Sequence, residues 1–118
     1  MSDWVSIAKE GEIPDNCAAR IEIDGIPIAV FHIGSKYFAT DDTCTHAEAS
    51  LSDGDIDTER NTVECPYHGS VFDLESGSAL SLPAVEPVKV HNVRVNENGD
   101  IQVKVTLFGF CEVAAESR

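Results

Sequence analysis

Apolar and polar residues alternate with a period of two over much of the chain, which indicates β-strands with one buried face. This alternation runs through residues 18–23 and ends at the turn sequence Asp24-Gly25. Residues 27–33 form a nearly continuous apolar run with β-branched side chains, which is typical of a strand buried on both faces. Gly34-Ser35 then predicts a two-residue hairpin that leads into a strand over residues 36–39.

The alternation is clearest near the carboxyl end, where residues 101–107 place four apolar side chains on one face, after a turn at residues 98–100. In the strand before that turn, the valines on either side of His91-Asn92 fall in opposite phases, which predicts a β-bulge there. No window of eleven or more residues shows a helical pattern. The sequence therefore predicts an all-β fold, a barrel-like sandwich of short antiparallel strands.

The middle of the chain, residues 41–84, is rich in Gly, Ser, Asp and Pro and has only short strand-like stretches, at 63–65 and 71–73. Such a segment buries too little apolar surface to order itself. We therefore expect a smaller subdomain here that a bound group holds in place. A chain of 118 residues is about the length of one domain. We therefore expect a single domain over residues 1–118 that includes this subdomain.

The chain carries 21 acidic and 8 basic side chains, a formal net charge of −13. This charge excludes a nucleic-acid-binding protein, which needs clustered Lys and Arg, and it favours partners with basic docking patches. Seven acids and one base lie within residues 41–60, which makes this segment either a docking surface or a solvated loop. With no apolar run of membrane-spanning length and no signal-peptide pattern, we expect a cytoplasmic protein whose cysteines stay reduced.

Two short segments each combine one cysteine with one histidine: Cys44-Thr45-His46 and Cys65-Pro66-Tyr67-His68. Four such ligands could hold one zinc ion tetrahedrally, but zinc sites usually pair like ligands on each segment. A two-iron, two-sulfide cluster fits the mixed segments better, because one iron can take both cysteines and the other both histidines. The other cysteines and histidines are expected to be ordinary packing or surface residues: Cys17, Cys111, His32 and His91.

The two segments resemble the cluster-binding signature of Rieske [2Fe–2S] proteins. The chain as a whole is similar to the small Rieske-type ferredoxins of bacterial aromatic-ring dioxygenases. The resemblance covers nearly all 118 residues and includes the Leu-Ser-Asp-Gly at 51–54. It implies a Rieske fold with one Rieske-type [2Fe–2S] cluster. It further implies that the Ser70 hydroxyl lies beside the cluster and that the loop around Pro83 covers it. The implied ligands of the cofactor and its metal ions are Cys44, His46, Cys65 and His68.

The same resemblance implies a one-electron carrier rather than an enzyme. Such a ferredoxin takes electrons from an NAD(P)H-dependent, FAD-containing reductase and passes them to the terminal oxygenase of a multicomponent aromatic-ring dioxygenase. We expect both contacts to be transient and electrostatically assisted, and the chain to be a monomer that binds neither nucleic acid nor membranes.

Two alternative functions stay open at this point. One is the ligand-bearing small subunit of an assimilatory nitrite reductase-like enzyme, and the other is a zinc-binding module with two cysteine and two histidine ligands. The oxygenase itself is excluded, because its catalytic iron needs two further histidines and a carboxylate on an additional large domain.

Overall fold

The computed structural model describes residues 4–43, 49–66, 69–81 and 87–105. In these ranges the chain forms nine strands and one short 3₁₀ helix, η1 (Leu51–Asp53), and no α-helix. It contains no helix there that is long and apolar enough to cross a membrane. The strands are β1 (Val5–Lys9), β2 (Cys17–Ile23), β3 (Ile26–Ile33), β4 (Lys36–Asp41), β5 (Asp55–Asp57), β6 (Thr62–Glu64), β7 (Val71–Asp73), β8 (Val90–Val95) and β9 (Asp100–Lys104).

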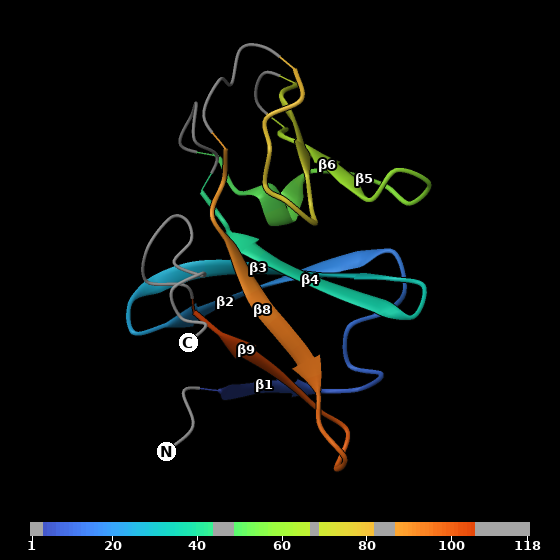
Figure 1. Cartoon of the computed structure of the whole chain (residues 1–118), viewed down its shortest axis with the longest axis vertical. Coiled ribbons are helices and arrows are strands. Elements are labelled where there is room, and N and C mark those ends of the chain that lie inside the picture. The colour runs from blue at the N-terminus through green and yellow to red at the C-terminus, as the bar shows by residue number, and fades with distance from the viewer. Residues whose placement is uncertain (1–3, 44–48, 67–68, 82–86, 106–118) are drawn as a thin grey trace, which may run out of the picture.

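The strands form two antiparallel sheets (Figure 1). The larger sheet has the order β1-β9-β8-β4-β3-β2 and is curved like a barrel, and the smaller sheet has the order β5-β6-β7. The smaller sheet lies at one end of the molecule, at the top of Figure 1. The predicted all-β fold of short antiparallel strands is confirmed.

Two tight turns connect β2, β3 and β4 at the positions that the sequence predicts. Asp24 and Gly25 have φ angles of 54° and 81°, the left-handed conformation that a two-residue hairpin between twisted strands requires. The second hairpin turns at Gly34-Ser35 and is closed by the pairing of Ile33 with Lys36.

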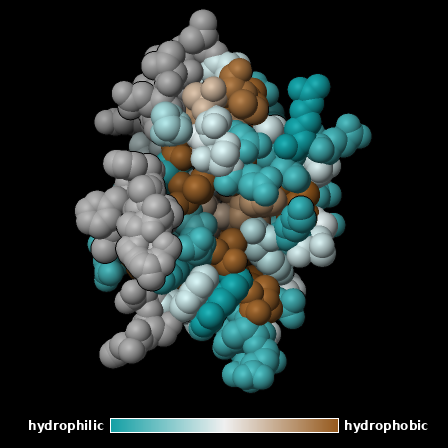
Figure 2. Space-filling model, viewed as in Figure 1, coloured by the Kyte–Doolittle hydropathy of each residue, from teal (hydrophilic) through white to brown (hydrophobic). Residues whose placement is uncertain are grey.

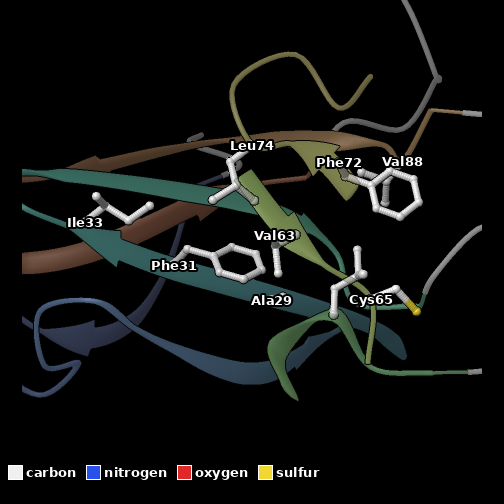
Figure 3. Packing of buried hydrophobic residues seen from close by; sticks show 9 residues of the cluster. Ala29, Phe31, Ile33, Val63, Cys65, Phe72, Leu74 and Val88 are labelled. Carbon is white, nitrogen blue, oxygen red and sulfur yellow. The ribbon is translucent and has the colours of Figure 1, made fainter. Parts of the chain in front are cut away.

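The alternating side chains of β3 divide the interior into two hydrophobic cores. Ala29 and Phe31 belong to the first core, whereas Ile28 and Val30 belong to the second. All four have no exposed surface, so the prediction of a strand buried on both faces is confirmed. The first core joins the larger sheet to the smaller one (Figure 3), and it also contains Ile33, Leu51, Val63, Cys65, Phe72, Leu74 and Val88.

Strand β8 corrects one expectation, the bulge at His91-Asn92. Val90 and His91 pair with β4, and the residues from Asn92 onward pair with β9. Val88, just before the strand, is buried in the first core, whereas Val93 packs against the second. The phase change therefore marks a strand that passes from one core to the other while it changes partner. The register irregularity that the structure describes lies in β1, between residues 6 and 8.

Candidate metal centre

Only one of the four predicted ligands, Cys65, falls among the described residues. Cys44, His46 and His68 lie outside them, as does Pro83. The described residues nevertheless flank each ligand segment closely. They therefore show how the fold holds the ends of both segments.

The ends of the first ligand segment are held together just beyond the end of β4, an inner strand of the larger sheet. Thr43 and Ser50 form an isolated antiparallel bridge, and the Leu51 N–H donates to the Asp42 carbonyl oxygen at 2.7 Å. Leu51 then begins η1, which contacts β2 and β3. Because Leu51 has no exposed surface and packs in the first core, this end of the segment is fixed to the interior.

Asp42 is the centre of a polar network beneath this segment. It is only 2% exposed, and its carboxylate accepts hydrogen bonds from the Ser52 N–H at 3.0 Å and from Arg20 Nε at 3.2 Å. Burial alone would raise the pKa of Asp42, but hydrogen bonds from Ser50 and Ser52 and the nearby charge of Arg20 outweigh it and lower the pKa. The carboxylate is therefore held in its charged form within the fold.

The second ligand segment connects β6 to β7. Cys65 follows β6 directly; its N–H donates to the Ser70 carbonyl at 2.7 Å, and its carbonyl accepts from the Gly69 N–H at 3.1 Å. Gly69 has a φ of 78°, which allows the chain to reverse within a few residues. These bonds make the two ends of the segment cross-strand neighbours.

Cys65 and Ser70, the two predicted site residues that the structure describes, are both buried. Cys65 is 2% exposed and Ser70 has no exposed surface. In Figure 3, Cys65 lies at one end of the first core, and its sulfur points away from Phe31 and Val63. The thiol thus has apolar side chains on one side.

A third segment runs beside the second. The Leu80 N–H donates to the Val71 carbonyl at 2.7 Å, and the Val71 N–H donates to the Ser81 hydroxyl at 3.0 Å. The Ser81 hydroxyl in turn reaches the Gly69 carbonyl at 3.5 Å. The chain that leads to Pro83 is therefore attached to the segment that carries Cys65.

These residues fit a cysteine-ligated iron–sulfur cluster. A buried thiol beside an apolar core and a tight backbone turn restrict solvent and fix the sulfur, and both properties favour such a cluster. The described ranges contain no group of three or more Cys, His, Asp or Glu side chains that could hold another metal ion.

The other cysteines and histidines have separate positions. His32 stacks on Tyr37 with ring centroids 4.3 Å apart, and Cys17 is exposed on β2. His91 is buried against Asp41. Cys111 lies outside the described residues.

Sequence reasoning missed the role of Asp42, which it counted only as one of seven acids in a docking or solvated segment. Its burial corrects that interpretation at this position. Its place two residues before Cys44 was the available signal, but the partner, Arg20, lies 22 residues away on β2.

Comparisons with known proteins show the family of this chain. The Rieske [2Fe–2S] domain family matches residues 3–102. The ferredoxin subunit of 3-phenylpropionate/cinnamic acid dioxygenase from Photorhabdus laumondii is 42% identical over 95 residues, which cover 80% of this chain and 88% of that protein.

Solved structures extend the comparison. The ferredoxin of carbazole 1,9a-dioxygenase from Nocardioides aromaticivorans is 30% identical with a TM-score of 0.85, covering 89% of this chain and all (100%) of that one. A ferredoxin solved in complex with the reduced oxygenase of carbazole 1,9a-dioxygenase is 35% identical with a TM-score of 0.79, covering 86% and 92%. Nitrite reductase small subunits share the fold alone, since one from Mycobacterium tuberculosis is 24% identical. The chain therefore belongs to the Rieske [2Fe–2S] domain family, whose cofactor is one Rieske-type [2Fe–2S] cluster.

Proposed function

We propose that this chain is the ferredoxin of a multicomponent aromatic-ring dioxygenase, a one-electron carrier and not itself an enzyme. The observation that carries the proposal is its 42% identity to a dioxygenase ferredoxin subunit over 80% of its length. A relative of nearly the same length is solved in complex with its oxygenase, which supports the same role. In this role an NAD(P)H-dependent, FAD-containing reductase supplies the electrons and the terminal oxygenase receives them.

In this proposal Cys44, His46, Cys65 and His68 hold the cluster, which when bound accepts and donates one electron. The buried position of Cys65 and the hydrogen-bonded ends of both ligand segments support this assignment. The described residues around the site act by holding the ligands in place and by limiting solvent access. The contacts of Ser81 with Val71 and Gly69 support a covering role for the loop that contains Pro83.

We further propose that residues 1–118 act as one domain with a cluster-binding subdomain over about 41–84. The smaller sheet and the flanks of both ligand segments fall within this range. A monomer suits a carrier that must present one site to two partners in turn. The cysteine ligands of the cluster suit a reducing compartment, which supports a cytoplasmic location.

The outer face of the smaller sheet supports transient, electrostatically assisted contacts. Three acids and one base line one depression beside Leu80, which is 56% exposed: Asp55, Asp57, Glu64 and Arg60. On the face drawn in Figure 2, hydrophobic residues form separate small patches among hydrophilic ones. An acidic surface with small apolar patches suits fast, reversible docking to a basic partner.

Visible absorption and low-temperature EPR of the purified protein test the proposal. We expect a coloured protein whose reduced form gives the low average g-value of a histidine-ligated [2Fe–2S] cluster. Substitution of Cys65 by Ser should reduce the amount of this cluster, whereas substitution of the exposed Cys17 by Ser should not. A colourless protein that contains zinc would overturn the electron-carrier function and restore the zinc-binding module.

A further inference from the structure

A buried carboxylate lies at the base of the first ligand segment. Asp42 is 2% exposed, although carboxylates are almost never buried to this degree without partners. Its own N–H donates to the Pro27 carbonyl at 3.0 Å, which fixes its backbone to the start of β3. The side chain is therefore presented from a rigid position.

The backbone and side chain of Asp42 together hold the far end of the ligand segment. The Asp42 carbonyl accepts from the Leu51 N–H, and the carboxylate accepts from the Ser52 N–H. The hydroxyl groups of Ser50 and Ser52 also bond to the carboxylate. Asp42, which precedes Cys44 and His46, thus holds residues 50–52, which follow these ligands.

Arg20 supplies the charge that opposes this carboxylate. It lies on β2 of the larger sheet, with its Nε 3.2 Å from Asp42 Oδ2. Its side chain is 48% exposed, so the pair taken alone would add little to stability. The buried partner changes that balance, because a carboxylate that loses one of its donors inside the protein is costly.

We propose that Arg20 and Asp42 are positioning residues, which fix the first ligand segment to the larger sheet and thereby set how tightly the chain holds its cluster. This inference rests on the proposed function, since it assumes that Cys44 and His46 are ligands. This role needs no contact between either residue and the metal. They act through the backbone of residues 50–52 and through their opposite charges.

The experiment compares the cluster-loaded wild-type protein with Asp42→Asn, Arg20→Gln and Arg20→Lys. Glu22→Gln is the matched control, because Glu22 lies on β2 and approaches Arg20 at 3.7 Å but is an exposed partner. Two quantities are measured: the rate at which visible absorption is lost in excess chelator, and the reduction potential by voltammetry.

We expect Asp42→Asn and Arg20→Gln to increase the rate of cluster loss about tenfold or more, as substitutions of outer-shell partners do. Arg20→Lys should have a smaller effect, because it keeps the charge but loses the guanidinium geometry. The reduction potential should rise in Asp42→Asn, which removes a negative charge, and fall in Arg20→Gln, which leaves that charge uncompensated. Glu22→Gln should resemble the wild type.

The inference would be overturned if Asp42→Asn and Arg20→Gln both lost the cluster at rates within twofold of the Glu22→Gln rate. Faster loss with no opposite shifts in potential would also overturn it, since a general loss of stability has that effect. If Asp42→Asn does not fold, Arg20→Gln and Arg20→Lys decide between the same outcomes. A wild-type protein without a histidine-ligated cluster would overturn the proposed function as well, which separates the two failures.

Discussion

His91 Nε2 and Asp41 Oδ1 lie 2.8 Å apart, although the two residues are 50 positions apart in the sequence. The imidazole has no exposed surface, whereas the carboxylate is 32% exposed. The bond joins β8 to the end of β4 at the point where β8 changes its partner strand. It therefore fixes β8 where this strand passes from one core to the other. Its carboxylate belongs to Asp41, the residue just before Asp42.

This bond leads to the first prediction, for Asp41→Ala. We expect the free energy of unfolding to fall by about 1–3 kcal/mol, because the buried imidazole loses its carboxylate partner. Asp41→Asn should lose less, since it keeps an oxygen in the same place. Urea denaturation followed by circular dichroism measures both variants. Equal stability of Asp41→Ala and the wild type would contradict the prediction.

Gly77 supports a second prediction, for Gly77→Ala. Its φ is +83°, and a Cβ atom there would overlap the Val88 carbonyl oxygen. The combined overlap and left-handed strain should lower the free energy of unfolding by about 3 kcal/mol. Gly25→Ala is the control, because Gly25 has a φ of +81° and no atom within 4 Å of an added Cβ. It should cost only about 1 kcal/mol. Equal losses would show that the close contact with Val88 is unimportant.

Asp100 supports a third prediction, on the pH dependence of stability. Hydrogen bonds from Lys9 and Asn96 lower the pKa of Asp100 below its ordinary value of 3.8. A carboxyl group with a lowered pKa in the folded state stabilises the fold above the unfolded-state pKa, and this stabilisation is lost as the pH falls through the folded-state pKa. The Asp100→Asn variant should therefore lose less stability than the wild type below about pH 4.

Urea midpoints between about pH 6 and pH 3 measure this effect. Glu97→Gln, in the same turn, is the control because it also removes one negative charge, here from an exposed residue. A steep acid dependence in Asp100→Asn that matches the control would count against the role of the Lys9 contact.

The acidic face of the smaller sheet supports a fourth prediction, on the rate of electron transfer to the oxygenase. The rate should fall as salt rises, because exposed charges are screened over about 10 Å at 0.1 M salt. Asp55→Asn combined with Asp57→Asn should weaken this salt dependence. Glu10→Gln combined with Asp24→Asn removes two exposed acids elsewhere and should leave it unchanged. Stopped-flow rates at several salt concentrations decide between these results.

The sequence was sufficient to predict the strands that bury one whole face or both. β3 is a nearly continuous apolar run and β9 alternates between apolar and polar residues, because their buried positions require apolar side chains. β1 is mostly exposed and β5 has a single apolar residue, Ile56, so neither strand has a pattern to detect. The phase change in β8 was visible, but a change of partner strand produces the same pattern as a bulge.

The candidate site shows the same division between local and distant information. The spacing of cysteine and histidine within each ligand segment is local, so the sequence alone indicated the chemistry. The support from Arg20 to Asp42 depends on contacts between distant segments, and a run of acids normally indicates a solvated surface. The burial of Asp42 depends on β2 and η1 lying side by side, which neither segment's sequence shows by itself.

Ser70 supports the last prediction, on the reduction potential. It has no exposed surface, and its carbonyl accepts a hydrogen bond from the Cys65 N–H. A hydroxyl that donates to a cluster or ligand sulfur stabilises the reduced, more negative state. Ser70→Ala should then lower the potential by about 40 mV, the equivalent of a hydrogen bond of about 1 kcal/mol. Ser81→Ala is the control, because that hydroxyl bonds to the neighbouring backbone of Val71. Voltammetry that finds no downward shift, or the same shift in both variants, would show that the Ser70 hydroxyl does not reach the cluster.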